Sequence, residues 1–407
     1  MDRTILHCDA NGFFASVECL YRPELKYVPM AVSGSVEDRH GIILAKNELA
    51  KGFGIKTTDT VGQARKKCPQ LVLVPPHHDR YQKYSSIING IYERFTDMVE
   101  PFGIDESWLD VTGSLHLFGG GKETADSIRE TVKRETGLTV SVGVSFNKTF
   151  AKLGSDLKKP DATTVISRDN YRDVVYPLPV SSLLFAGKAA TKMLKELGIT
   201  TIGRLAAFDK AAITDKLGKM GAMLHDCANG IDESPVHFAG EEREAKSVGN
   251  GMTFRRDLAG IEDITSGVLA LSDTVAARLR RHGLKCSAVQ VMIRDPQFKT
   301  ISRQKKLAKP TCLAKDISGA ALEIIKASWN LSAPIRMLTI TGLSLCAADK
   351  GQLSFFDEEP NSAKQEKIER AIDDIRSKFG SGAISVGTNL YNDIVAGASD
   401  SERKEEQ

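Results

Sequence analysis

The sequence predicts an α+β fold divided into several domains. Its 407 residues are too many for one hydrophobic core. Short apolar runs with strand character alternate with segments whose apolar residues recur at helical spacing. Their mixed order, with short turns between them, is typical of an antiparallel or mixed sheet covered by helices. The composition, 41% apolar and 26% charged residues, is that of a globular protein.

The first 165 residues are expected to form the first α+β layer. We expect strands at residues 5–9, 30–33, 41–45, 104–111 and 139–144. We expect helices at residues 13–20, 79–99, 124–136 and 147–157. The apolar residues of each helical segment recur on one stripe, and Pro160 ends the last helix.

The rest of the chain is divided by a proline-rich boundary at residues 177–179 and a charged linker at 241–246. Between them we expect short helices separated by glycine, at residues 189–197, 202–208 and 216–229. Beyond the linker we expect strands at 288–293 and 338–345 and helices at 264–281, 317–329 and 362–379. Gly380 stands where a helix C-terminus favours glycine.

Three carboxylates are the most informative residues of the first region. Asp105 and Glu106 are adjacent in an apolar, strand-like run, and Asp9 ends another. A buried, unpaired carboxylate loses several kcal/mol of hydration, so these residues predict a cation between them, above all Mg²⁺. Neighbouring side chains on a regular strand point to opposite faces, so we expect a hairpin bend at the pair. We expect Asp110 to be structural and Glu18 to lie on a helix surface or in a local salt bridge.

A possible phosphate site follows at residues 141–160. Ser145 or Asn147 can cap the next helix, whose N-terminal amides favour anions. Four lysines near the carboxylates would suit a triphosphate, although helical lysines are usually only solvated: Lys148, Lys152, Lys158 and Lys159. Phe13 and Phe14, close to Asp9, either pack a sugar ring or simply begin a hydrophobic helix.

Charge is distributed unevenly along the chain. Residues 241–346 hold 17 lysines and arginines against 10 acidic residues, a net charge of +7, and residues 347–407 carry −5. A basic block indicates either a surface that faces a polyanion or a solvated face.

The seven cysteines form no CxxC pair, and there is neither a leader nor a long apolar run. We therefore expect a cytoplasmic protein without a membrane span.

Three segments, in this order and spacing, resemble the motifs of the Y-family (translesion) DNA polymerases, especially the bacterial polymerase IV type. They are HCDANGFFASVE at 7–18, GIDESWLD at 103–110 and VGVSFNKTFAKLGSDLKKP at 142–160. The resemblance covers roughly residues 1–346 and implies a low-fidelity, template-dependent DNA polymerase shaped like a right hand. It implies an α+β palm (1–10 and 75–165), small fingers (11–74), a helical thumb with a helix-hairpin-helix element (166–240), an α+β little finger (241–346) and an acidic tail (347–407).

The resemblance also assigns the metal site. Asp9 and Asp105 would bridge two Mg²⁺ ions, or Mn²⁺ in their place, and the carbonyl of Ala10 would complete one shell. Glu106 would hold the ion at the primer 3′-hydroxyl and help to activate that hydroxyl. The reaction would be attack of this hydroxyl on the α-phosphate of a dNTP, with release of pyrophosphate.

The incoming nucleotide is expected to lie beside Phe13 and Phe14. By resemblance, Phe14 is the steric gate that clashes with a ribose 2′-hydroxyl, and backbone amides near Phe13 and Phe14 bind the triphosphate with Lys159. The family usually offers a tyrosine and an arginine to the phosphates, where this sequence has Glu48 and Lys51. Lys51 supplies a positive charge, but it cannot donate the two parallel hydrogen bonds of an arginine guanidinium. Glu48 cannot replace the tyrosine.

The DNA contacts implied by resemblance lie in the thumb and the little finger. Gly187 belongs to a helix-hairpin-helix turn whose amides approach phosphates, but Phe185 stands where the family usually has glycine. Basic residues on or beside strands of the little finger are expected to follow the DNA backbone: Arg255, Arg256, Arg294, Lys299, Arg303, Lys305 and Lys306.

Residues 352–356 resemble the short peptide with which bacterial polymerases bind the sliding clamp. Its apolar residues are poor choices for a solvated linker, and either a clamp pocket or the 362–379 helix would cover them. The clamp-binding residues would be Gln352, Leu353, Phe355 and Phe356. We expect a monomer whose partners are primed DNA, dNTPs and the clamp.

Two other functions are consistent with parts of the sequence. A nucleotidyl cyclase also uses a palm-like sheet with paired carboxylates, but it needs neither the basic block nor a hairpin thumb. A non-catalytic DNA-binding scaffold would account for Glu48 and for the altered hairpin at Phe185. Primer extension with Mg²⁺ and four dNTPs would separate a polymerase from both.

Overall fold

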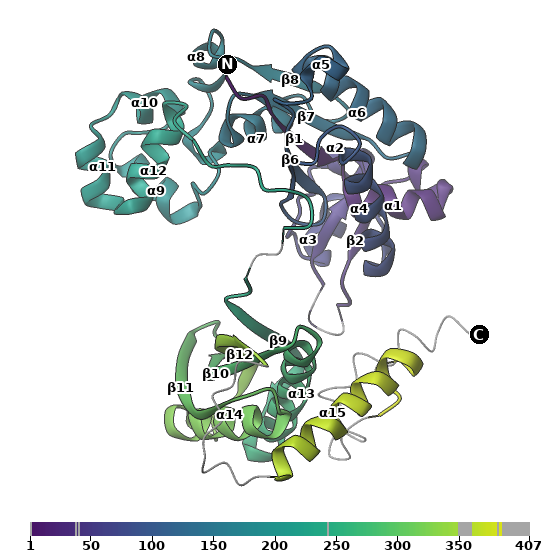
Figure 1. Ribbon diagram of the computed structural model, residues 1–407, viewed down its shortest axis with the longest axis vertical. Coiled ribbons are helices and arrows are strands. Elements are labelled where there is room, and N and C mark those ends of the chain that lie inside the picture. Colours follow the sequence, from purple (N-terminus) through teal and green to yellow (C-terminus); the bar gives the residue numbers. More distant parts are fainter. Residues whose placement is uncertain are drawn as a thin grey trace. The chain divides into compact units, whose positions relative to one another are not determined.

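A computed structural model describes residues 2–36, 39, 41–241, 244–348, 360–380 and 382–384 (Figure 1). The chain separates into two compact units. The first comprises residues 1–34 and 42–242, and the second comprises 35–41 and 243–407. The expected clamp peptide, residues 352–356, lies outside the described residues. The helices of the described part are all too short or too polar to cross a membrane.

A five-stranded sheet forms the centre of the first unit. Its spatial order is β5 (Val99–Pro101), β6 (Glu106–Asp110), β1 (Ile5–Ala10), β7 (Val140–Ser145) and β8 (Thr163–Ile166). Neighbouring strands are antiparallel except β7 and β8, which are parallel. The prediction of a mixed sheet is therefore confirmed.

Helices cover both faces of this sheet. On one face, Leu6 and Cys8 of β1 share a core with residues of α4 (His78–Tyr92) and α6 (Gly121–Thr136), and α5 (Leu115–Phe118) contacts α6. On the other face, Ile5 packs with Trp108 and with Ala151 of α7 (Lys148–Leu157). Successive residues of β1 thus point to opposite helical layers, as a strand with a period of two requires.

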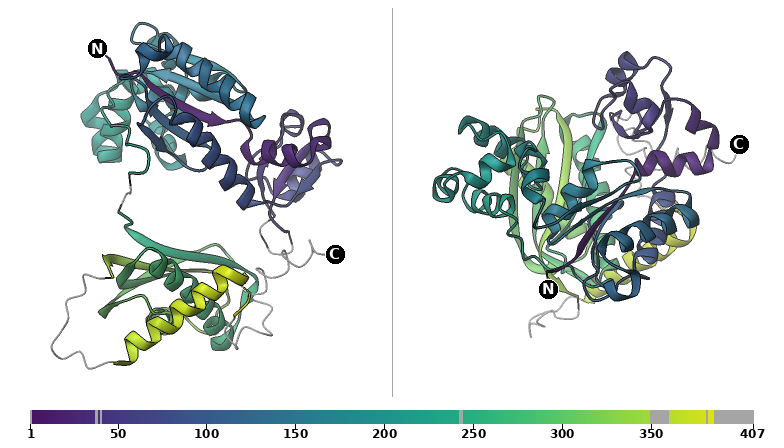
Figure 2. Two further views of the ribbon diagram at one scale, coloured as in Figure 1. Left: turned by 45° about the vertical axis from the view of Figure 1, so that its right-hand side comes forward. Right: turned by 90° about the horizontal axis from the view of Figure 1, so that it is seen from above.

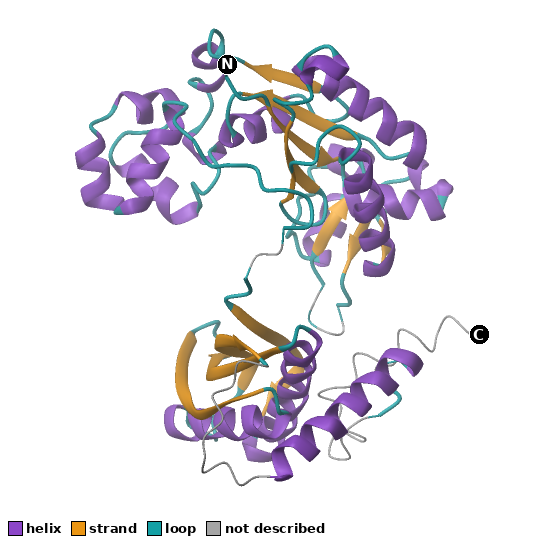
Figure 3. Ribbon diagram, viewed as in Figure 1, coloured by secondary structure: helices purple, strands orange, loops and turns teal. Residues whose placement is uncertain are grey.

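Two smaller parts complete the first unit. The first is a three-stranded sheet in the order β3 (Ile43–Lys46), β2 (Met30–Ser33), β4 (Val72–Val74), with helices α1 (Phe13–Tyr21), η1 (Pro23–Tyr27), α2 (Glu48–Gly52) and α3 (Val61–Lys67). The second consists of helices and loops (Figure 3). Its helices are α8 (Tyr171–Val175), η2 (Val180–Ser182), α9 (Lys188–Glu196), α10 (Ile202–Ala207), α11 (Lys210–Leu217) and α12 (Lys219–Ala228).

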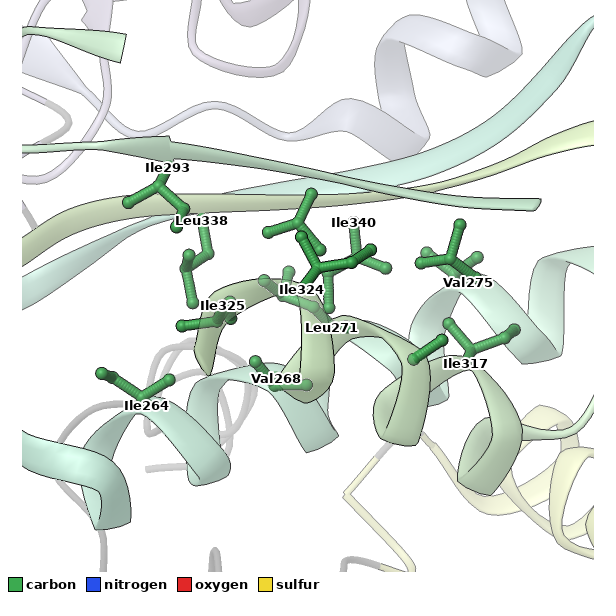
Figure 4. Packing of buried hydrophobic residues seen from close by; sticks show 14 of the residues in the cluster. Ile264, Val268, Leu271, Val275, Ile293, Ile317, Ile324, Ile325, Leu338 and Ile340 are labelled. Carbon is green, nitrogen blue, oxygen red and sulfur yellow. The ribbon is translucent and has the colours of Figure 1, made fainter. Parts of the chain in front are cut away.

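The second unit is built on a four-stranded antiparallel sheet. Its order is β11 (Thr300–Thr311), β10 (Leu284–Arg294), β12 (Ile335–Ala347) and β9 (Ser247–Leu258). Helices α13 (Gly260–Arg281) and α14 (Ala314–Ser328) cover one face, and their isoleucines, leucines and valines point toward those of the strands (Figure 4). Helix α15 (Pro360–Phe379) packs against α13 (Figure 2), where Asp373 accepts a 2.6 Å hydrogen bond from the buried Arg280.

Some expected elements differ from the structure. The helix expected at 79–99 ends at Tyr92, and Val99 already belongs to strand β5. The helix expected at 216–229 is α12 alone, because Gly218 separates it from α11. Strands β9 and β11 were not predicted: β9 is mostly half-buried but has polar residues or glycine at most positions, β11 is largely exposed and polar, and both lack an apolar alternation.

The close approach of α7 to the sheet depends on Gly143 of β7. A Cβ atom there would lie 1.9 Å from the carbonyl oxygen of Ala151 and 2.5 Å from the backbone nitrogen of Ser155. Both atoms belong to the backbone of α7, so no side-chain movement could relieve the contact. Any side chain at residue 143 would therefore push α7 away from the sheet.

We expect Gly143→Ala to lower the free energy of unfolding by roughly 3 kcal/mol or more, because helix and strand must separate to admit a methyl group. Thermal unfolding measures the effect. Gly90→Ala is the matched control: its Cβ would meet nothing within 4 Å, so this change within α4 should leave the melting temperature unchanged or raise it. Equal melting temperatures for the two variants would contradict the close approach.

Candidate active site

The three predicted carboxylates meet at one end of the five-stranded sheet. Asp9 of β1 pairs directly with Glu106, the first residue of β6. Asp105 precedes β6 in the bend that joins it to β5, and its carbonyl accepts a 2.9 Å hydrogen bond from the amide of Ala10. The expected hairpin bend is confirmed. It frees Asp105 from the strand alternation that would otherwise separate it from its neighbour.

Two lysines neutralise these carboxylates. Lys159, in the loop after α7, places its Nζ 2.7 Å from Asp9 and 2.6 Å from Asp156. Lys152 of α7 donates a short hydrogen bond to Glu106. The strand-to-helix segment therefore brings cations to the carboxylates, as its lysines suggested.

The pKa values of the carboxyls differ because their surroundings differ. Burial raises the pKa of Asp9 to about 7; the positive charge of Lys159 opposes this shift, and the nearby Glu106 and Asp105 add to it. Burial and Glu106 likewise raise the pKa of Asp105. Burial also acts to raise the pKa of Glu106, but the contacts with His7 and Lys152 outweigh it and lower that pKa to about 2.

His7 supports Glu106 from inside the sheet. Its ring is fully buried, with Nδ1 2.8 Å from the hydroxyl of Ser155 and Nε2 3.3 Å from the Glu106 carboxylate. The Ser155 hydroxyl donates to the carbonyl of Lys152, so Nδ1 carries a hydrogen and donates it to the Ser155 oxygen, and Nε2 can donate to Glu106 only when the ring is doubly protonated. Burial lowers the pKa of His7. No sequence motif singled out this residue, although it lies two positions before Asp9 on the same face of β1.

The donor set suits a hard divalent cation. Asp9, Asp105 and Glu106 offer carboxylate oxygens, the ligands that such cations prefer. The lysine ammonium groups beside Glu106 and Asp9 show that these carboxylates require a positive charge next to them. Within the described ranges, no three His, Cys, Asp or Glu side chains surround a common point closely enough to hold a metal ion. The residue types therefore fit Mg²⁺, while two of the carboxylates are bound to lysines instead.

Lys148 does not belong to this cluster, contrary to the expectation for the four lysines. It is buried, with its Nζ 2.7 Å from Glu100 and 4.3 Å from the centre of the Trp108 ring. Its ammonium also donates to the carbonyl of Pro235 at 3.2 Å. Lys148 thus holds β5, β6 and the chain after α12 together, and it is structural.

Phe14 lies in a stack of aromatic rings. Its ring is parallel to that of Tyr81 in α4, with the ring centres 3.9 Å apart. The hydroxyl of Tyr81 donates a 2.6 Å hydrogen bond to Glu18, which also contacts His77 at 2.9 Å and Arg80 at 3.2 Å. Glu18 is fully buried, so the helix-surface alternative was wrong; it forms a salt bridge instead, with partners 59 and 62 residues away in the chain rather than local ones. It fixes the tyrosine against which Phe14 stacks.

The loop that carries Lys159 is held by Asp161, which sequence analysis missed. Asp161 has a positive φ of 51°. Its carboxylate accepts hydrogen bonds from Arg129 at 2.8 Å and Lys133 at 2.9 Å, and its amide donates to the side chain of Asn11 at 2.9 Å. A signal was present in the sequence, because aspartate is among the few residues that tolerate this conformation after a proline turn.

Comparisons with known proteins find relatives that match nearly the whole chain. The chain matches the impB/mucB/samB family over residues 8–156 and the C-terminal domain of that family over residues 245–355. A DNA polymerase IV of Acetivibrio thermocellus is 46% identical over 393 residues, 96% of this chain and 98% of the relative. A DNA polymerase IV of Clostridium kluyveri is 38% identical over 396 residues, 95% of this chain and 98% of the relative.

The chain belongs to the Y-family of DNA polymerases. A solved structure of a Y-family DNA polymerase chimera of Dbh and Dpo4 has the same fold, with a TM-score of 0.74 and 22% identity over 84% of this chain and 99% of the chimera. The predicted α+β fold and the resemblance to Y-family polymerases are confirmed. The chain is a DNA-directed DNA polymerase, rather than a cyclase or a scaffold.

The phosphate position expected at Glu48 and Lys51 lies in helix α2. Lys51 and Glu48 form an exposed ion pair with 3.2 Å between Nζ and the carboxylate. Asn47 caps the helix by accepting a 2.9 Å hydrogen bond from the amide of Ala50. Lys51 thus has a carboxylate as its neighbour where the family usually has a tyrosine.

Gly187 caps helix α9 beside an open hollow of about 730 Å³. The hollow is lined by Ser181, Ala186, Gly187, Lys188, Thr191, Lys192, Lys195 and Glu196. A helix N-terminus with lysines around it favours phosphate. The hairpin therefore retains the groups needed for a phosphate contact, although Phe185 replaces the usual glycine.

The basic residues of the second unit divide between the two faces of its sheet. Arg303 and Lys305 of β11 pair with Val291 and Val289, which are buried under the helices, and Lys305 also bonds to Glu323 of α14. Lys306 and Arg294 alternate with them and lie on the opposite face. Lys299 is exposed at the turn, Arg255 is exposed on β9, and Arg256 pairs with Asp263.

Proposed function

We propose that this polymerase extends primers by two-metal-ion phosphoryl transfer and acts in DNA damage tolerance and repair. The supporting observation is the pairing of Asp9 with Glu106 beside Asp105, with Lys152 and Lys159 at the same carboxylates. The relatives named DNA polymerase IV support a translesion role.

The proposed mechanism assigns a task to each carboxylate. Asp9, Asp105 and the carbonyl of Ala10 would hold two Mg²⁺ ions, or Mn²⁺, which activate the attacking oxygen and stabilise the leaving one. Glu106 would hold the ion at the primer 3′-hydroxyl and help to activate that hydroxyl, and its low pKa keeps it ionised. Lys159, now bound to Asp9, is placed to hold the triphosphate together with amides near Phe13 and Phe14.

The parts of the fold correspond to a proposed right hand. The five-stranded sheet and its helices would be the palm (1–10 and 75–165), and the three-stranded part would be the fingers (11–74). The helical part would be the thumb (166–240), followed by the little finger (241–346) and the tail (347–407). Gly187 and the basic residues of β9, β10 and β11 would contact primed DNA. We propose a cytoplasmic monomer.

Removal of the proposed metal ligands tests this assignment. We expect Asp9→Ala and Glu106→Ala to reduce primer extension at least about 10²-fold while leaving DNA affinity nearly unchanged, because they stabilise charge only during the reaction. Extension of a primed template with Mg²⁺ and four dNTPs measures the effect. Asp110→Asn is the control, since the carboxylate of Asp110 accepts hydrogen bonds from Thr112 and none from the lysines of the site. Normal turnover in both alanine variants would contradict the assignment of Asp9 and Glu106 as metal ligands.

The stacked Phe14 is proposed as the sugar gate. We expect Phe14→Ala to increase ribonucleotide incorporation about tenfold or more, because a methyl group no longer collides with a 2′-hydroxyl. Competing dNTP and rNTP incorporation on one template measures the ratio. Phe53→Ala, an exposed phenylalanine of the same region, should leave the ratio unchanged. Unchanged discrimination in the Phe14 variant would refute the gate.

The peptide at residues 352–356 is proposed to bind a sliding clamp, with Gln352, Leu353, Phe355 and Phe356 as its contacts. We expect replacement of Phe355 and Phe356 by alanine to remove most of the clamp-stimulated synthesis and to spare clamp-free synthesis, since the apolar anchors act only on the partner. Extension assays with and without clamp measure this. Phe379→Ala, on the exposed end of α15, is the control. Full stimulation of the double variant would exclude the clamp role.

A further inference from the structure

Phe185 is an exposed aromatic residue in a backbone conformation that large side chains rarely adopt. Its φ is +69°, and 57% of its surface is exposed. A positive φ is an outlier for a bulky residue, because Cβ crowds the neighbouring carbonyl. Such strain persists mainly where the surrounding structure imposes it and function uses it.

The turn around Phe185 is firmly anchored. Leu183 and Ala186 on either side of it are buried, and the amide of Ala186 donates a 3.0 Å hydrogen bond to the carbonyl of Leu183. The amide of Gly187 donates at 2.9 Å to the carbonyl of Phe185 itself. The two neighbours therefore hold the turn in the core, while the phenyl ring remains at the surface.

The chemistry beside this ring suits a nucleic-acid backbone. Gly187 begins α9 next to the open hollow, and Lys188, Lys192 and Lys195 line it against one acid, Glu196. These groups favour an anion, and phosphate is the anion that a DNA polymerase meets here. The phenylalanine lies two residues before the cap, next to Ala186, which lines the hollow.

The same combination occurs a second time in the chain. Among the described residues other than glycine, six have a positive φ, and Phe185 and Phe298 are the aromatic ones. Phe298 has a φ of +64°, is 64% exposed in the turn between β10 and β11, and lies under the guanidinium of Arg336 at 4.9 Å. Both strained rings thus lie in turns that are close to basic side chains.

We propose that Phe185 is an apolar DNA contact whose ring packs against the deoxyribose next to the phosphate bound at the start of α9. This inference rests on the proposed phosphate contact of the Gly187 hairpin. A sugar face is the apolar surface closest to a bound phosphate, and its burial favours binding without regard to sequence. Insertion between bases would instead require unstacking, which costs energy. An apolar contact also adds affinity that does not depend on counterion release.

The test uses the full chain with Phe185→Gly, Phe185→Leu and Lys188→Ala. Fluorescence anisotropy gives the Kd for a primed duplex at several salt concentrations, and thermal unfolding controls for folding. We expect Phe185→Gly to weaken binding about three- to tenfold at every salt concentration without lowering the melting temperature, because glycine accepts the positive φ. Phe185→Leu should retain most of the affinity. Lys188→Ala should reduce the salt dependence by about one phosphate contact.

The other possible results would each contradict a different part of the proposal. Wild-type affinity in Phe185→Gly together with weakened binding in Lys188→Ala would overturn the role of Phe185 and leave the hairpin contact intact. Wild-type affinity in both would show that the hairpin contact itself is absent. An equal loss in the leucine and glycine variants would indicate stacking on a base, and would overturn the sugar contact.

Discussion

Repulsion among three carboxylates at one end of a sheet is the constraint on which the catalytic region depends. Strand pairing sets Asp9 opposite Glu106, and the bend before β6 adds Asp105. In a partly buried site such charges must be balanced by cations or neutralised by protons. Lys152 and Lys159 supply positive charge from α7 and the loop that follows it. Their position is set by the contact between α7 and Gly143, so the close approach of the α7 backbone to β7 helps to determine the electrostatics of the site.

The sequence predicted this site correctly where a residue's contacts are with residues near it in the chain, and failed where they are with residues far away in the chain. The bend at Asp105 and Glu106 followed from strand alternation alone, and the cap at Asn147 followed from residue type; the structure confirms both. The burial of Lys148 and Glu18 was not predicted, because their partners, Glu100 and Tyr81, are distant in sequence and no local pattern indicates these contacts. A charged residue on an amphipathic helix is usually solvated, and only tertiary packing overrides that expectation.

The fold was predictable to a similar extent. Strands β1 and β7 are buried along their whole length and were found with nearly correct ends. Strand β11 is polar at most positions, because it lies at an edge where only a few side chains reach the core. Lysines on an exposed edge strand discourage pairing with another chain. The polar sequence that prevented prediction of β11 therefore also prevents this edge from pairing with another chain.

The lysines at the two ends of the proposed triphosphate site are held in different ways. Lys51 pairs with Glu48 at the surface, and exposed ion pairs of this kind add little stability, so Lys51 can exchange partners at small cost. Lys159 is largely buried between Asp9 and Asp156, and Asp161 fixes its loop through Arg129 and Asn11. A phosphate can attract Lys159 only after the charge of Asp9 has been satisfied by another cation. Nucleotide and metal binding should therefore be coupled through Lys159, whereas the weaker contribution of Lys51 should not depend on the metal.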